Sequence, residues 1–133
     1  MFTDEFKKHG IGSTVFTRSR NIEKLLGINK LFIKFEAGNP TGSMKDRASY
    51  ATLNNANEKG FDSIVVASCG NFGASIINLS KIFSITPHVY IPEKYQTPRI
   101  LEMERQGGIV HRAPGTYEEV VELSSGEAED KGW

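Results

Sequence analysis

The sequence predicts an α/β fold: a small three-layer domain in which a parallel sheet is flanked by helices. Two observations lead to this prediction. Short apolar runs typical of buried strands alternate with longer segments of helical periodicity, and Gly- or Pro-containing turns separate them. Strands and helices that alternate at this spacing form right-handed crossovers, with the helices on the faces of the sheet. A chain of 133 residues is long enough for one compact domain of this kind.

The sequence of residues 1–40 predicts only short helices and strands. The first 12 residues are polar and contain glycine, so we expect a loosely held arm. The candidates that follow are a β-prone run at 14–17, a short helix at 21–26 that ends at Gly27, and a half-exposed strand at 30–36. We therefore assign residues 1–40 to an N-terminal arm, a strand and the lead-in to a turn, and residues 41–133 to the small α/β domain.

Residues 41–133 contain the alternating strands and helices. The segment 63–67 (SIVVA) is a continuous apolar run, which indicates a strand buried on both faces. Further strands are expected at 87–91 and, from a weaker pattern, at 109–112. Helices are expected at 44–59, after the turn SCGNFGAS, after the N-cap Thr97 with Pro98, and after Thr116, which forms a capping box with Glu119.

Composition and charge exclude several classes of protein. Sixteen basic and sixteen acidic residues balance, so no overall field favours nucleic acid or an anionic membrane. Cys69 is the only cysteine, which excludes an internal disulfide and a multi-cysteine metal site, and we expect no metal. The charged N-terminus does not resemble a signal peptide, and no segment approaches the roughly 20 apolar residues of a membrane span. We expect a cytoplasmic protein that binds neither nucleic acid nor a membrane.

One lysine stands out, because Lys45 follows the small polar turn at 39–43 and opens the helix expected at 44–59. The positive end of a helix dipole, together with the nearby Arg47, favours an uncharged amine. An uncharged lysine amine reacts with carbonyl compounds to form a Schiff base. The alternative is an ordinary turn and N-cap with a solvated lysine in the first turn, and the local pattern alone favours this alternative.

A second candidate is the loop SCGNFG, which follows the strand at 63–67. In parallel α/β sheets, ligands bind beyond the carboxyl ends of the strands, where helices begin. Gly70 and Gly73 allow a ligand to approach the backbone closely, the Ser68 hydroxyl and exposed N–H groups suit a carboxylate or phosphate, and Asn71 adds an amide. The alternative is a tight strand-to-helix connection without a ligand.

We expect structural rather than catalytic roles for the cysteine, for two of the histidines and for a group of charged residues. Cys69 as a nucleophile is disfavoured, because the sequence ties none of the three histidines to it. His88 and His111 fall within expected strands, so we interpret them as sheet residues. The charged residues Lys94, Arg99, Glu102, Glu104 and Arg105 are typical of a solvated helix face.

Taken together, the two candidate segments resemble those of a known family. KFEAGNPTGSMKDRAS resembles the lysine motif of the pyridoxal-phosphate enzymes of the tryptophan-synthase β fold, or fold type II, and SCGNFGAS resembles their SGNTG-type loop. The resemblance covers nearly all of this chain, which would be less than half of a complete member. It is closest to threonine synthase and next to cysteine synthase.

The resemblance implies specific roles for the candidate residues. Lys45 would form the Schiff base with the cofactor, pyridoxal 5'-phosphate, and then move the α-proton of the substrate. Asn71 would bind the 3-hydroxyl oxygen of the cofactor. The loop residues Ser68, Cys69, Gly70 and Phe72 would bind the α-carboxylate of a small amino-acid substrate. Phe72 stands where the family commonly has threonine, which leaves that carboxylate without one hydroxyl donor.

The resemblance also implies what lies outside this sequence. The family's loop for the cofactor phosphate belongs to a large C-terminal domain, which we expect to be absent here. We therefore expect the N-terminal portion of an enzyme of amino-acid biosynthesis, a lyase or transferase that catalyses β- or γ-elimination and replacement. Its expected partners are a second copy of the chain or a complementing C-terminal domain. The alternatives are a cysteine synthase-like enzyme or a non-catalytic truncated module of the same fold; a generic nucleotide-binding domain is disfavoured, because its phosphate fingerprints are missing.

Overall fold

The computed structural model describes the backbone of residues 2–133 and the side chains from Asp4 onward. The chain divides into two compact units, Met1–Arg47 and Ala48–Trp133. The boundary falls inside one helix, α3 (Lys45–Glu58), whose first residues belong to the first unit. Among residues 2–133, no helix has the length and apolar character needed to span a membrane.

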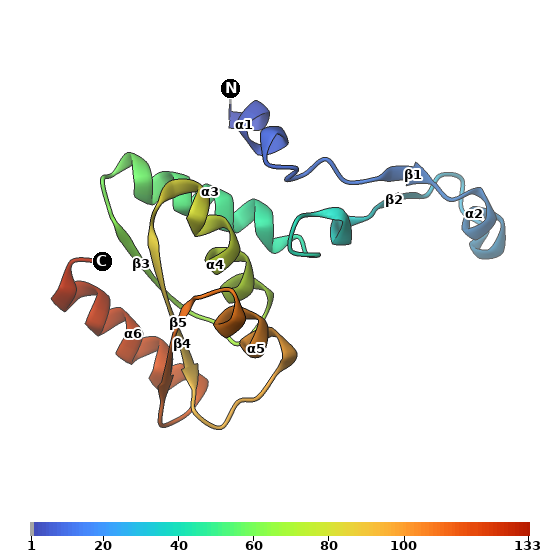
Figure 1. Cartoon of the computed structure of the whole chain (residues 1–133). Coiled ribbons are helices and arrows are strands. Elements are labelled where there is room, and N and C mark those ends of the chain that lie inside the picture. Colours follow the sequence, from blue (N-terminus) through green and yellow to red (C-terminus); the bar gives the residue numbers. More distant parts are fainter. Residues whose placement is uncertain (1) are drawn as a thin grey trace. The chain divides into compact units, whose positions relative to one another are not determined.

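The first unit consists of short elements (Figure 1). A two-stranded antiparallel ribbon is formed by β1 (Phe16–Arg18) and β2 (Phe32–Lys34), and Phe16 and Phe32 stack with ring centroids 5.3 Å apart. Between the strands lies α2 (Arg20–Leu26), and β2 leads into the 3-10 turn η1 (Glu36–Gly38). Both strands are shorter than the sequence predicts, and all their residues are exposed.

The N-terminal residues differ from the prediction of a loosely held arm, because α1 (Phe2–Lys8) forms there. Acidic residues in its first turn and Lys7 and Lys8 in its last turn complement the helix dipole. Ile11, just after the helix, is 1% exposed and belongs to the core. The predicted helix at 21–26 is confirmed as α2, and Gly27 ends it in the left-handed conformation (φ 66°).

The second unit is the predicted three-layer α/β arrangement (Figure 1). Its parallel sheet has the order β3-β4-β5, with strands β3 (Ser63–Ala67), β4 (Thr86–Pro92) and β5 (Ile109–Ala113). The helices are α4 (Asn71–Phe83), α5 (Pro98–Arg105), α6 (Tyr117–Lys131) and the remainder of α3. The predicted caps are confirmed: Thr97 accepts from the Ile100 N–H, and Thr116 and Glu119 form a capping box.

Each face of the sheet has its own core. Alternate β4 residues Val89 and Ile91 pack with α4 and α5, whereas Tyr90, between them, packs with Val120 of α6. The prediction that the strand at 63–67 is buried on both faces is wrong, because all five residues of β3 are only half-buried. The order of the strands explains this: β3 lies at an edge of the sheet, and β4 is the central strand with a continuous buried run.

Close packing of α4 requires glycine at position 73. A Cβ built on Gly73 would lie 2.9 Å from both the Met103 Sδ and the Ser68 carbonyl oxygen. Contacts this short force neighbouring atoms to shift, and the backbone oxygen has little freedom to do so. Gly70, three residues earlier, has open space at the same position, with nothing within 4 Å. The two glycines of the loop therefore serve different purposes.

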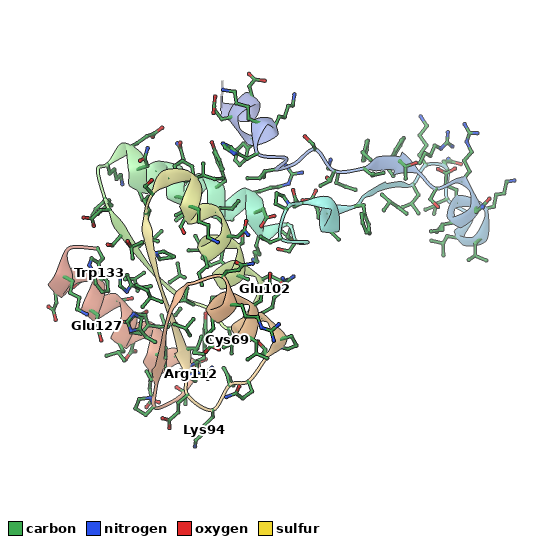
Figure 2. All side chains as sticks on the ribbon, in the orientation of Figure 1. Cys69, Lys94, Glu102, Arg112, Glu127 and Trp133 are labelled. Atoms are coloured by element: carbon green, nitrogen blue, oxygen red, sulfur yellow. The ribbon has the colours of Figure 1, made fainter. Side chains whose placement is uncertain are left out.

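The face of the sheet under α6 carries a polar and aromatic cluster, with Glu127 and Trp133 labelled in Figure 2. His88 Nδ1 and His111 Nε2 lie 3.0 Å apart, and the His88 ring stacks on Trp133 with centroids 3.7 Å apart. The Tyr90 hydroxyl donates to Glu127 at 2.6 Å. His88 and His111 are thus sheet residues, as predicted. Burial lowers the pKa of both histidines, and burial and Glu127 raise the pKa of Tyr90.

Replacing Gly73 by alanine should destabilise the second unit by about 1–3 kcal/mol, because the added methyl group overpacks the contact between α4, β4 and α5. The matched variant Gly70→Ala should change the free energy of unfolding by no more than about 0.5 kcal/mol, since its Cβ meets no atom. Denaturant unfolding of both variants measures the difference. Equal destabilisation by the two substitutions would contradict the assignment of Gly73 as the packing glycine.

The histidine pair should make stability depend on pH. Because the folded-state pKa of each histidine is below its ordinary value of 6.5, the unfolded chain binds more protons in that range. The free energy of unfolding should therefore keep its full value above pH 6.5 and decrease as pH falls below 6.5. Denaturant midpoints at about pH 7.5 and pH 5.5 measure this. His111→Gln should reduce the decrease, whereas His9→Gln should retain it; an unchanged decrease in His111→Gln would count against the pair as its source.

Candidate functional site

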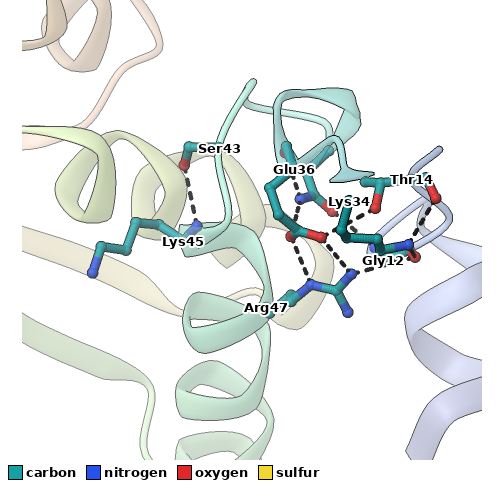
Figure 3. A network of polar contacts seen from close by, with 8 residues as sticks. Gly12, Thr14, Lys34, Glu36, Ser43, Lys45 and Arg47 are labelled. Carbon is teal, nitrogen blue, oxygen red and sulfur yellow. Dashed lines mark hydrogen bonds and ion pairs between the residues drawn. The ribbon is translucent and has the colours of Figure 1, made fainter. Parts of the chain in front are cut away.

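The turn before Lys45 is held by hydrogen bonds within the first unit. The Lys45 N–H donates to Ser43 Oγ at 3.2 Å, and Ser43 is buried. Gly42 has a φ of 76°, which suits a glycine in a tight turn. The side chain of Lys45 is exposed and extends away from Ser43 and from the neighbouring polar network (Figure 3). The turn fixes the backbone of Lys45 and leaves its amine accessible.

Asp46 stabilises the same turn from inside the protein. Its carboxylate is fully buried and accepts the Thr41 N–H at 2.8 Å and the Thr41 hydroxyl as well. A buried carboxylate is costly without hydrogen-bond donors, so the turn supplies the donors that Asp46 needs. Sequence reasoning did not assign a role to Asp46; an acidic residue in the first turn of the helix was the available signal.

A second network joins the turn to residues 12–14 (Figure 3). The Glu36 carboxylate accepts from Arg47 Nε at 2.8 Å and Arg47 Nη2 at 2.9 Å, and also from Asn39 and Thr14. Asn39 Oδ1 in turn accepts the Gly12 N–H at 2.8 Å. The hydrogen bonds from Arg47 lower the pKa of Glu36 to about 2. The positive charge of Arg47 is therefore paired with the Glu36 carboxylate.

The loop Ser68–Gly73 in the second unit leaves backbone donors available. The Ser68 hydroxyl oxygen accepts the Gly73 N–H at 3.0 Å and the Gly70 N–H at 3.4 Å, so its own proton is free to be donated to another group. Within residues 2–133, the N–H groups of Asn71 and Phe72 at the start of α4 have no hydrogen-bond partner. An anion can bind to donors arranged in this way.

The first turn of α5 holds this loop at two points. Thr97 Oγ1 donates to the Cys69 carbonyl oxygen at 3.1 Å, and Arg99 Nε donates to Asn71 Oδ1 at 2.8 Å. The prediction that Arg99 belongs to a solvated helix face is therefore wrong, because its guanidinium is engaged with the loop and with Glu102. No local pattern signals this contact, which joins residues 28 positions apart.

Cys69 does not have the surroundings of a reactive thiol. Its side chain is half-buried against the core of α4, β4 and α5, and burial raises its pKa. A raised pKa reduces the thiolate form that acts as a nucleophile. Within the part of the chain that the structure describes, no group of three or more His, Cys, Asp or Glu residues could hold a metal ion.

The structure places the predicted site residues in two groups. Ser68, Cys69, Gly70, Asn71 and Phe72 lie together between β3 and the first turn of α4, and Lys45 belongs to the first unit. The sequence named the central residues of each group as candidates. The residues that hold them, Asp46 and Glu36 for the lysine turn and Thr97 and Arg99 for the loop, become apparent only in the structure.

Comparison with known proteins assigns the chain to a family. The model of the family described as "Pyridoxal-phosphate dependent enzyme" matches residues 7–133. Threonine synthase from Methanocaldococcus jannaschii is 33% identical over 121 residues, which cover 90% of this chain and 30% of that protein. The 2-amino-4-ketopentanoate thiolase beta subunit from Acetoanaerobium sticklandii is 30% identical over 128 residues, covering 88% of this chain and 26% of the relative. The chain thus spans less than a third of the length of these curated relatives.

Solved structures share the fold. A pyridoxal 5'-phosphate-dependent aspartate racemase superimposes with a TM-score of 0.84 at 24% identity, covering 98% of this chain and 41% of the racemase. Cysteine synthase from Entamoeba histolytica gives a TM-score of 0.79 at 19% identity, covering 92% of this chain and 39% of that structure. Both are enzymes of fold type II, as the sequence motifs predict. The chain therefore belongs to the pyridoxal-phosphate dependent enzyme family and has the fold of its fold type II members.

Proposed function

We propose that this chain is the N-terminal portion of a pyridoxal-phosphate-dependent enzyme that catalyses β- or γ-elimination and replacement on amino acids, as threonine synthase does. The observation that carries the proposal is the exposed amine of Lys45, at the first residue of α3, in a chain of this family. Similarity to threonine synthases from several organisms supports this class of activity. The part of the relatives that this chain does not match would complete the cofactor site.

Lys45 is the residue that would hold the cofactor covalently, through its Nζ atom. Ser43 and Asp46 fix the backbone on both sides of it, so only the flexible side chain needs to move. Nζ would also be the group that accepts the proton from the substrate α-carbon and returns it. A lysine on a rigid turn suits both roles, holding the cofactor and transferring the proton. The turn fixes the position of its Cα atom, and rotation about its side-chain bonds moves Nζ between the two positions.

The loop at the start of α4 fits the anionic parts of the cofactor and substrate. The side-chain amide of Asn71 would donate to the 3-oxygen of the cofactor. The unpartnered N–H of Phe72 and the free proton of the Ser68 hydroxyl are donors for the substrate α-carboxylate, and the open space at Gly70 lets that group approach. When bound, the pyridine ring of pyridoxal phosphate supplies the electron sink that stabilises negative charge at the α-carbon.

Phe72 affects this part of the proposal. It supplies a backbone N–H like any other residue at that position, but its half-buried side chain has no hydroxyl to donate. The carboxylate would then depend on backbone donors and on Ser68. Cys69, whose side chain packs into the core, would contribute its backbone alone.

Incubation with pyridoxal phosphate followed by borohydride reduction should attach the cofactor to Lys45, and mass spectrometry of proteolytic peptides identifies the modified residue. Lys45→Ala should lose this labelling. Lys59→Ala removes an exposed lysine just beyond the other end of α3 and should leave it unchanged. Because any exposed lysine reacts slowly with an aldehyde, the proposal requires Lys45 to be labelled well above the others; equal labelling of Lys59 would contradict it.

A second experiment addresses catalysis. The full-length protein should release phosphate or acetate from an O-phospho- or O-acetyl-amino acid, and Lys45→Ala should abolish the release. Preference for the phospho substrate is expected for a threonine synthase-like enzyme and preference for the acetyl substrate for a cysteine synthase-like one. Cofactor attachment to Lys45 without turnover of either substrate would favour the non-catalytic module.

A further inference from the structure

The amide of Asn71 is held in one orientation by Arg99. Arg99 Nε donates to Asn71 Oδ1 at 2.8 Å, although the Asn71 side chain is otherwise exposed. A guanidinium has donors and no acceptor, so only the oxygen of the amide can face it. The amide nitrogen with its two protons therefore faces away from Arg99. An exposed asparagine without such a contact can rotate and present either its oxygen or its nitrogen to a ligand.

Arg99 is itself held in place. It is half-buried in the first turn of α5, and its Nη1 donates to Glu102 Oε2 at 2.6 Å. Thr97, two residues earlier, joins the start of α5 to the Cys69 carbonyl oxygen. These contacts connect α5 to the loop on both sides of Gly70. The orientation of Asn71 is thus fixed before any ligand arrives, which lowers the entropy lost on binding.

We infer that Arg99 is a positioning residue that presents Asn71 as a hydrogen-bond donor to an ionised oxygen of the bound cofactor. The inference rests on the proposed function, in which that oxygen is the 3-oxygen of pyridoxal phosphate. A charged donor on Oδ1 also polarises the amide and strengthens the hydrogen bonds that its nitrogen donates. The arrangement favours the ionised oxygen over the protonated hydroxyl, because the free side of Asn71 offers donors.

A double-mutant cycle on the full-length protein tests this inference, with pyridoxal phosphate as the probe. Arg99→Met removes the donor and keeps much of the side-chain length, and it should weaken cofactor binding by roughly 5- to 10-fold, as expected for the loss of one hydrogen-bond partner. It should also shift the visible absorption band of the bound cofactor. In an Asn71→Ala background the same substitution should have no further effect, because there is no amide left to orient. Arg99→Lys should restore part of the binding.

Glu102→Gln is the matched control. It removes the charge of the side chain but keeps an oxygen that accepts from Arg99 Nη1, and it leaves the contact with Asn71, so cofactor binding and the absorption band should stay within twofold of the original values. Equal effects of Arg99→Met in the presence and absence of Asn71 would overturn the inference, because they would indicate a purely structural role.

A measurement without cofactor separates this inference from the proposed function. The side-chain amide protons of Asn71, followed by NMR, should change their chemical shifts in Arg99→Met and remain unchanged in Glu102→Gln. If the shifts respond but the original protein does not bind pyridoxal phosphate, the proposed function fails and the role of Arg99 toward the cofactor fails with it. If the protein binds the cofactor but the shifts do not respond, the inference alone is overturned.

Discussion

Parallel pairing of β3, β4 and β5 is the constraint on which the second unit depends. Parallel neighbours need a crossover connection, so the segments that follow the three strands all emerge at one edge of the sheet. Side chains distant in sequence meet there as a consequence. Arg99, beyond β4, reaches Asn71, beyond β3, and Tyr117, beyond β5, donates to the carbonyl oxygen of Ala67 at the end of β3. The candidate loop is thus braced by residues from both neighbouring connections.

The lysine turn is organised by a different principle, the supply of hydrogen-bond donors to two carboxylates. Asp46 is fully buried and satisfied by Thr41, and Glu36 receives two hydrogen bonds from Arg47. Removing the donors of the buried Asp46 would leave its carboxylate unsatisfied, so Asp46 and Thr41 hold each other in place. Lys45 stands between Asp46 and the rest of the turn with an exposed side chain. Rigid surroundings and one accessible amine are what a covalent cofactor site requires.

The sequence allowed the second unit to be predicted well because its signals are local. Capping residues such as Thr97 and Thr116 act on neighbours within four positions. The candidate residues Lys45 and Asn71 were found from their position after a turn and a strand. What could not be predicted depends on contacts across the chain. In the sequence, Arg99 and Arg105 are equivalent charged residues of one helix. Only the arrangement of the connections after β3 and β4 brings Arg99 to the loop and leaves Arg105 exposed.

Helix α1 and strand β3 illustrate the same limit in other ways. The seven residues of α1 include few apolar side chains, so no helical periodicity was available from which to predict the helix. The run SIVVA was correctly read as a strand, yet its place at the edge of the sheet is a property of strand order, which an apolar pattern does not contain. Sequence patterns describe what an element is, and topology decides what surrounds it.

Trp133 gives the second unit a built-in optical probe. It is the only tryptophan in the chain, its indole ring stacks on His88, and the Lys131 ammonium lies 4.4 Å from the ring centroid. Its fluorescence therefore arises from one place, where Trp133, two residues after the end of α6, contacts the central strand. Emission from this protein reports the docking of its last helix onto the sheet, free of any signal from the lysine turn.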